Sequence, residues 1–253
     1  MHSFRLAIGF LTIVPANPGD AAPTGPARSY FPLVGLALGG VLAGLDIALG
    51  QVLPLMVVGA VLLIAMLALT RALHTEGFLD VCDGLLGGHS PSERLRILGD
   101  THVGAFAVIG GTGLLLLKWT LLVGIPDAGR IGLLVLFPCM SRLAMVVAMD
   151  AFTYVRRQGI GNSFQVGRSR WQVAFALATA LAAGGLLGGI GGLILAGTAV
   201  VVSLGLGWSL TGLLGGLTGD AYGAVNEVAE VTVLVMGIAL LRELRGLFQA
   251  PFW

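Results

Sequence analysis

Long runs of apolar residues, separated by short polar stretches, dominate the pattern of this chain. A bilayer core needs about 20 mostly apolar residues for one helical crossing. The segments that approach this length are Leu33–Gly50, Val52–Leu69, Val103–Val123, Ile131–Met149, Gln172–Gly189, Gly191–Leu210 and Val228–Leu241. The pattern therefore predicts an all-α fold, a polytopic integral membrane helical bundle with about six or seven transmembrane helices. We expect residues 1–253 to form a single membrane domain.

The first 32 residues differ from the apolar runs that follow. The stretch "MHSFRLAIGFLTIVPANPGD" has one Arg, a short apolar run and then a Pro-rich part. It lacks the small-residue cleavage site of a secretory signal. We expect residues 1–32 to form an interfacial helix followed by a loop.

Glycine is frequent inside the apolar runs, as in "LVGLALGGVLAG" and "LLGGIGGLILAG". Small residues at three- and four-residue spacing let membrane helices approach closely. These glycines therefore predict close helix packing.

The polar stretches indicate an orientation. With the N-terminus in the cytoplasm, Arg71–His102, Asp150–Trp171 and Thr211–Glu227 all lie on the cytoplasmic side, and the first two hold half of the 14 Lys and Arg residues. Cytoplasmic loops of membrane proteins carry such an excess. We expect a multi-pass protein of the cell inner (cytoplasmic) membrane, embedded in the lipid bilayer, with its active site facing the cytoplasm. Arg242 and Arg245 fit this orientation less well.

Composition supports the membrane assignment and narrows the function. The 253 residues are 56% hydrophobic and 11% charged, whereas soluble domains are about 25% charged. A net charge of +1 without a Lys/Arg-rich run argues against nucleic acid as a partner. The composition leaves open whether the active unit is a homo-oligomer.

Three carboxylates lie close together in "HTEGFLDVCDGLLGG", within the acidic segment 71–102. If residues 74–86 are helical, Glu76, Asp80 and Asp83 share one face, because their spacing is i, i+4, i+7. Oxygen donors crowded in this way suit Mg²⁺ or Mn²⁺. We expect Gly84, Gly87 and Gly88 to leave the nearby surface open to a phosphate-bearing ligand.

The same segment continues with "SPSERLRILGDTHVG". Ser90, Pro91 and Glu93 have the spacing of a helix start, with Ser90 as N-cap, so we expect a structural role for Glu93. Asp100 comes just before the next apolar run and joins the candidate ligands.

A second acidic segment, residues 211–230, contains "GLTGDAYGAVNEVAE". Asp220 and Glu227 are seven residues apart and therefore share a helical face, with Asn226 beside them. Carboxylates at the start of an apolar segment are functional-site candidates, although acids also favour helix N-termini. Between the two acidic segments, Arg142 lies inside an apolar run and needs an anionic partner or ligand.

The chain thus has two acidic patches suited to divalent metal and several cytoplasmic arginines suited to phosphate. This combination predicts a membrane phosphotransferase that acts on a nucleotide-activated substrate. The chain lacks the sequence signatures of a Walker loop or a Rossmann fingerprint.

Several of these motifs also resemble a known family, the adenosylcobinamide-GDP ribazoletransferases, also called cobalamin-5′-phosphate synthases. The resemblance covers nearly the whole chain and includes "HTEGFLDVCDGLLGG", "ILGDTHVGAFA", "GLTGDAYGAVNE", "FLTIVPAN…SYFPLVGLALGG" and "SRLAMV…YVRRQGIGNSF", in the family's order. It implies an inner-membrane enzyme that requires Mg²⁺ and joins adenosylcobinamide-GDP to α-ribazole or its 5′-phosphate, releasing GMP.

The resemblance also implies roles for individual residues. Glu76, Asp80, Asp83 and Asp100 would hold Mg²⁺ on the pyrophosphate. Asp220, Asn226 and Glu227 would complete the site, and one carboxylate, with His74 as a further candidate, would take the proton of the ribazole hydroxyl. Phosphate and substrate contacts would come from Arg142, Arg156, Arg157 and Asn162.

This chain departs from the family pattern at a few positions. Glu76 replaces the usual Asp, Gly99 and His102 replace usual basic residues, and Ile13 replaces an expected Arg. The absence of basic side chains beside Asp100 would weaken phosphate contact there or shift it to Arg94, Arg96 or Arg156.

Two other functions share some of these sequence features. A CDP-alcohol phosphotransferase also displays Asp-x-x-Asp-Gly on a membrane helix, but its pattern continues differently from the "LLGG" found here. A cation-coupled transporter would place its carboxylates near the bilayer midplane. Most acidic residues here lie instead at one predicted face.

Overall fold

The structure is a computed structural model that describes residues 2–15, 25–156, 164 and 167–248. Its helices are α1 (His2–Leu11), η1 (Gly25–Tyr30), α2 (Phe31–Leu49), α3 (Leu55–Leu69), α4 (Leu73–Gly87), α5 (Pro91–Ile97), α6 (Ala105–Gly124), α7 (Arg130–Ala151), α9 (Arg170–Leu214), α10 (Gly219–Glu243) and η2 (Arg245–Leu247). Within these residues the one extended pairing is an isolated bridge between Tyr154 and Leu217. The predicted all-α membrane fold is confirmed.

Five helices are long and apolar enough to cross a membrane by themselves: η1 with α2, α6, α7, α9 and α10. Helices α3 and α4 pass the same test only as a pair, which is bent by 90°. The prediction of a full crossing at Val52–Leu69 is therefore wrong for α3 alone, since its 15 residues fall short of the length that a bilayer core requires. We treat α4 as lying outside the five spans, because it carries three carboxylates and turns away from α3.

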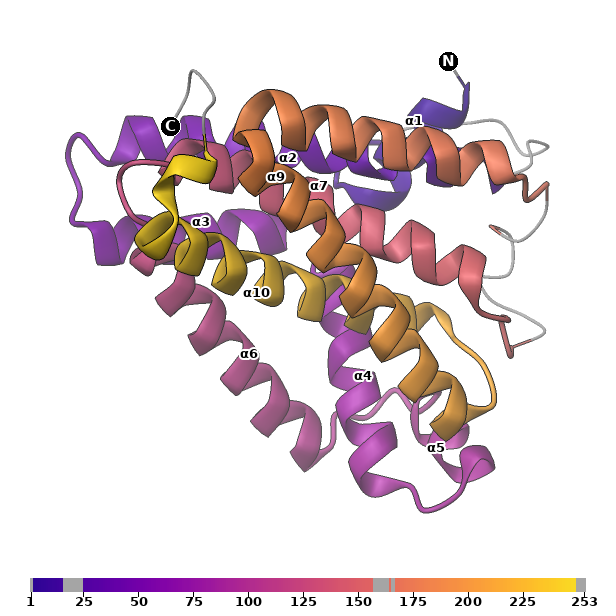
Figure 1. Cartoon of the computed structure of the whole chain (residues 1–253). Helices are drawn as coiled ribbons and strands as arrows, with labels where there is room; N and C mark the ends of the chain where they lie inside the picture. Colours follow the sequence, from indigo (N-terminus) through magenta and orange to yellow (C-terminus); the bar gives the residue numbers. More distant parts are fainter. Residues whose placement is uncertain (1, 16–24, 157–163, 165–166, 249–253) are drawn as a thin grey trace.

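Helix α7 forms the centre of the bundle, and α2, α9 and α10 pack around it (Figure 1). Its side chains are buried along most of its length. Gly39 of α2 contacts the backbone of α7 at Val135, and a Cβ on Gly35 would lie 2.7 Å from the Cα of Cys139. The expected role of glycine in close packing is confirmed here.

Helix α9 contains 45 residues and covers two predicted segments, Gln172–Gly189 and Gly191–Leu210. It bends at Gly189, whose φ of 57° is left-handed and is readily adopted only by glycine. The bend returns the second half of the helix across the bundle (Figure 1). The break between the two segments thus lies where the sequence predicted it.

The turn between α3 and α4 has a strained backbone. Arg71 and Ala72 have φ values of 54° and 52°, a conformation that costs a non-glycine residue about 1–3 kcal/mol. Arg71 Nη2 donates a hydrogen bond to the carbonyl of Gly9, at 3.1 Å, which ties this turn to α1. The turn directs α4, with its carboxylates, across the bundle.

Candidate active site between α4 and α10

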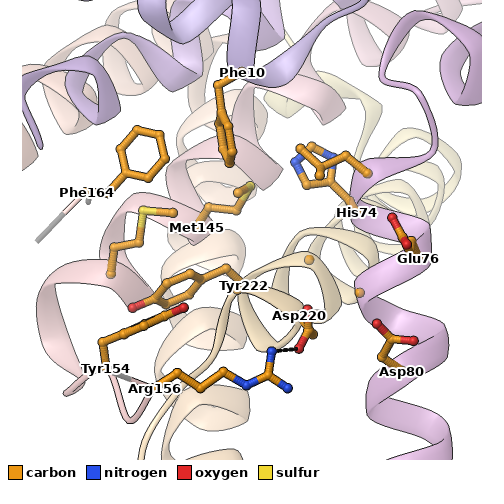
Figure 2. Close-up of a pocket in the computed structure, with 15 residues that line it drawn as sticks. Phe10, His74, Glu76, Asp80, Met145, Tyr154, Arg156, Phe164, Asp220 and Tyr222 are labelled. Atoms are coloured by element: carbon orange, nitrogen blue, oxygen red, sulfur yellow. Dashed lines mark ion pairs between the residues drawn. The ribbon is translucent and has the colours of Figure 1, made fainter. Parts of the chain in front are cut away.

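The first acidic stretch folds as predicted, as helix α4. Glu76 and Asp80, one turn apart, line a pocket with a cavity volume of about 240 Å³. Asp220, in the first turn of α10, faces the same pocket (Figure 2). Thr218 fixes the start of α10, because its hydroxyl accepts a hydrogen bond from the amide of Ala221 at 3.1 Å. We call Glu76, Asp80 and Asp220 the pocket carboxylates.

Two glycines allow α4 and α10 to cross closely enough for these carboxylates to share a pocket. A Cβ on Gly77 would lie 2.8 Å from the Cα of Asp220, and one on Gly223 would lie 2.8 Å from the carbonyl oxygen of His74. Both distances are shorter than real Cβ contacts allow. Gly77 and Gly223 therefore set the distance between the two helices. Gly219 has open space beside it and lines the pocket.

Arg156 supplies a positive charge at this pocket. The bridge at Tyr154 places it: the amide of Val155 donates to Leu217 at 2.9 Å, and the amide of Leu217 donates to Thr153 at 2.8 Å. Arg156 Nη1 then lies 3.0 Å from Asp220 Oδ2. Arg156 Nη2 is buried and has no hydrogen-bond partner among the described residues. This nitrogen is available to an anionic ligand.

Gly99 leaves room beside the same guanidinium. A Cβ at Gly99 would lie 3.8 Å from Arg156 Nη2. The positive charge of Arg156 thus stands beside the position where the family pattern predicts a basic residue and this chain has glycine.

Electrostatic repulsion is strong among the pocket carboxylates. Burial, together with the negative charges of Asp220 and Glu76, raises the pKa of Asp80 to about 6. The described residues that line the pocket include three carboxylates and one guanidinium. A bound cation would relieve this excess of negative charge.

Asp83 lies elsewhere, although its spacing predicts the same face. Its carboxylate accepts hydrogen bonds from the amides of Gly104 and Ala107, at 2.7 and 2.9 Å. These amides begin α6, where backbone N–H groups have no partner within the helix. The far end of the α4 face therefore meets the start of α6 rather than the pocket.

Asp100 is also absent from the pocket. It is exposed and lies 2.7 Å from His102 Nδ1, and the hydrogen bond with His102 lowers the pKa of its carboxyl group. Asp83 and Asp100 line a separate surface depression. The predicted ligand set of Glu76, Asp80, Asp83 and Asp100 is thus divided between two places.

Glu227 and Asn226 are buried in α10 and do not line the pocket. Lys118 of α6 donates to Glu227 at 2.7 Å and to Glu230 at 2.5 Å. Glu230 also accepts hydrogen bonds from Asn226, at 3.0 Å, and from Arg142. We call Lys118, Arg142, Glu227 and Glu230 the buried ion network.

Arg142 therefore has a protein partner and is fully buried, so the expectation that it contacts substrate is not supported. The physical reason is that a carboxylate of the same bundle neutralises it. Thr75 donates to Glu227 at 3.0 Å, and His74 contacts Arg142, so this network contacts the first turn of α4. Arg157 and Asn162 lie outside the described residues.

Three glycines that we expected to leave open surface near the first acidic stretch behave differently. Gly84 contacts Leu98, a Cβ on Gly88 would lie 2.6 Å from the Arg94 side chain, and one on Gly87 would lie 3.6 Å from Ile97. They make room for α5 instead. The start of α5 matches its prediction, since the amide of Glu93 donates to Ser90 Oγ at 3.3 Å and the amide of His89 donates to the Glu93 carboxylate at 2.9 Å.

The donor set of the pocket fits a magnesium ion that is shared with a phosphate ligand. Mg²⁺ is usually held by one or two carboxylates together with substrate phosphates and water. Across the described residues, no three His, Cys, Asp or Glu side chains lie close enough together to hold a metal alone. Glu76, Asp80 and Asp220 are the residues that would contribute oxygen ligands.

The aromatic and methionine side chains of the pocket and the pairing of Lys118 were not predicted from the sequence. Phe10, Met145, Met149, Phe164 and Tyr222 look like ordinary apolar core positions in the sequence, and nothing in their spacing marks them. Lys118 did carry a signal, because it is the one lysine of the chain and lies inside an apolar run. Such a charge requires a buried partner.

Comparisons with known proteins give the same family as the sequence motifs. The family model of cobalamin-5-phosphate synthase matches residues 3–238. A protein from Desulforamulus reducens is 34% identical over 97% of this chain and 99% of its own length. Proteins from Desulfitobacterium hafniense and Geotalea daltonii are 36% and 37% identical, each over 95% of this chain and 98% of their own length.

All three relatives are named adenosylcobinamide-GDP ribazoletransferase. No solved structure matches the chain. The family match over most of the chain favours a phosphotransferase of this kind over a CDP-alcohol phosphotransferase or a transporter. The protein is an enzyme that belongs to the cobalamin-5-phosphate synthase family.

Proposed function

We propose that the protein is a Mg²⁺-dependent phosphotransferase of the inner membrane, with its pocket facing the cytoplasm. It joins adenosylcobinamide-GDP to α-ribazole or α-ribazole 5′-phosphate and gives adenosylcobalamin, or its 5′-phosphate, and GMP. The observation that carries the proposal is the convergence of Glu76, Asp80 and Asp220 with Arg156 in one pocket. The names of the relatives supply the substrate class.

The reaction transfers one phosphoryl centre. The ribazole hydroxyl oxygen forms a bond to the phosphorus nearest the cobinamide, and the bond from that phosphorus to the bridging oxygen breaks. GMP leaves with the bridging oxygen, and a pocket carboxylate accepts the hydroxyl proton.

The side chains present supply what such a transfer needs. One or two of Glu76, Asp80 and Asp220 would hold Mg²⁺ together with phosphate oxygens, and the bound ion would offset the negative charge of the pyrophosphate. Arg156 would bind a phosphate oxygen through its unpartnered Nη2. The buried ion network holds the first turn of α4 and so keeps Glu76 and Asp80 opposite Asp220.

The size of the pocket sets which part of the substrate it takes. Sites for drug-sized ligands have volumes of about 300–1,000 Å³. A cavity of about 240 Å³ is smaller, so the corrin ring would lie outside it. Only part of each substrate, including its reacting groups, would lie inside it.

The test uses purified protein in detergent with adenosylcobinamide-GDP and α-ribazole 5′-phosphate, with Mg²⁺ or with EDTA. We expect GMP and a corrinoid product in equal amounts, and only with Mg²⁺. An Asp127→Asn variant, changed at an exposed residue of the α6–α7 loop, is the control for the substitutions below. Absence of product from folded protein, or equal product with EDTA, would contradict the proposal.

A further inference from the structure

The pocket has two chemically different sides. Figure 2 shows Phe164, Phe10, Met145 and His74 along one side of the pocket, with Phe10 and Met145 between the other two, and Arg156, Asp220 and Asp80 on the opposite side. Phe10 and Phe164 contact each other, with ring centroids 4.6 Å apart. We call the first group, with Met149, the apolar side. It offers flat, hydrophobic surface directly beside the phosphate-binding groups.

One polar atom at the apolar side has no protein partner. His74 is 3% exposed, and its Nε2 makes no hydrogen bond to any described residue. Leaving a buried ring nitrogen without a partner is unfavourable, so such atoms are rare in folded proteins. An unpartnered nitrogen in a ligand pocket therefore indicates that a ligand completes it.

The contacts of His74 fix which ring nitrogen carries the proton. Arg142 Nη2 lies 3.4 Å from His74 Nδ1. A guanidinium group can only donate hydrogen bonds, so Nδ1 is the acceptor. In the neutral ring the proton is then on Nε2, which makes this atom a donor. Glu230 holds Arg142 in place from the other side.

These observations specify a ligand that is flat, mostly apolar and able to accept one hydrogen bond. The ribosyl benzimidazole of a ribazole has these properties, since one ring nitrogen bears the ribose and the other is an unsubstituted acceptor. We propose that the apolar side binds the benzimidazole of the ribazole substrate, and that His74 Nε2 donates a hydrogen bond to its unsubstituted ring nitrogen. This inference rests on the proposed function.

Guanine, the other base of the reaction, fits the apolar side poorly. Its edge carries several donors and acceptors, and leaving them buried without partners is costly. Among the described side chains of the apolar side, His74 provides the one N–H or O–H donor. The guanosine part therefore lies elsewhere. His74 Nε2 carries a hydrogen and donates a hydrogen bond, so it is not the group that accepts the proton of the ribazole hydroxyl.

The test compares two acceptor substrates in the wild-type enzyme. One is α-ribazole 5′-phosphate, and the other is its indole analogue, in which C–H replaces the unsubstituted ring nitrogen. We expect kcat/KM to be about tenfold to a hundredfold higher for the benzimidazole, because the indole leaves a buried donor unpaired.

Variants of His74 then show whether His74 is the residue that causes this preference. In His74→Phe, which keeps an aromatic ring but has no donor, we expect the preference for the benzimidazole substrate to fall to within about twofold. His74→Gln keeps a terminal N–H and should retain part of the preference. Met145→Leu changes only the apolar wall and should lower kcat/KM equally for both substrates. Thermal unfolding in detergent checks that each variant is folded.

Two results would overturn the inference. Equal kcat/KM for both substrates in the wild type would show that the proposed hydrogen bond is absent. An equal loss of kcat/KM for both substrates in folded His74→Phe would show that His74 acts in the chemistry or in the packing of α4 instead. Failure of the proposed function looks different, since the wild type would then release no GMP with either substrate.

Discussion

The pocket carboxylates and the buried ion network share helices α4 and α10 but have opposite electrostatic conditions. In the network, two carboxylates face two cations, and every charged group is buried with a protein partner. In the pocket, three carboxylates face Arg156, and Asp80 and Asp220 are partly exposed.

This difference separates structural acids from functional ones. A buried charge is tolerated when it is paired within the protein, whereas charges left unbalanced in a pocket need a ligand. Glu227 and Asp220 are both carboxylates of one helix, yet Lys118 neutralises the first and the second lines a pocket. Charge balance, more than residue type, therefore indicates which acids belong to the site.

The largest expected effect tests the structural half of this comparison. Glu230→Gln leaves Lys118 and Arg142 with insufficient negative charge in the core, which should lower the free energy of unfolding by about 3–5 kcal/mol. Thermal unfolding in detergent measures the loss. Glu243→Gln, on the exposed end of α10, is the matched control and should change little. An unchanged unfolding temperature in Glu230→Gln would show that the network does not hold the bundle.

A second substitution tests the functional half. Asp80→Asn should lower kcat/KM by at least about a hundredfold, since a neutral amide is a poor ligand for Mg²⁺. Its unfolding temperature should be equal to or above that of the wild type, because one of three mutually repelling carboxylates is removed. GMP release and thermal unfolding measure the two effects. Wild-type turnover in Asp80→Asn would exclude this carboxylate from the site.

The helix crossing that joins the two regions can be changed directly. Gly77→Ala places a methyl group against the backbone of Asp220, which should cost about 1–3 kcal/mol of stability through overpacking. Turnover should fall as well, because α4 and α10 must separate. Gly40→Ala is the control, since a Cβ there meets nothing within 4 Å. Equal behaviour of the two variants would mean that the crossing is looser than the contacts indicate.

The smallest effect is expected at Asp83, which shares its helical face with Asp80 but caps α6. Asp83→Ala removes two hydrogen bonds to the first turn of α6 and should cost about 1 kcal/mol of stability. Turnover should stay within about tenfold of wild type, because Asp83 does not line the pocket. A loss of turnover as large as that of Asp80→Asn would place Asp83 in the active site, as its spacing in the sequence predicts.

Local sequence determined much of this protein. Apolar runs predicted most of the membrane helices, because a helix crosses lipid only if its consecutive residues are apolar. They also predicted the break in α9, because a bend at a glycine depends on that residue and its neighbours in the chain. The spacing of Ser90 and Glu93 predicted the start of α5, because capping is a contact between residues three apart. Helix α4 and its shared face of carboxylates followed from the helical period.

Only the tertiary structure decided which of these carboxylates meet. Glu76 and Asp220 are far apart in the sequence, and they share a pocket because Gly77 and Gly223 let two helices cross. Asp83 is spaced like its neighbours but reaches the amides of α6. Glu227 looks like an active-site acid until Lys118, from a distant helix, is found beside it. Helical period fixes the direction of a side chain, whereas its partner depends on how distant helices pack, which local spacing does not encode.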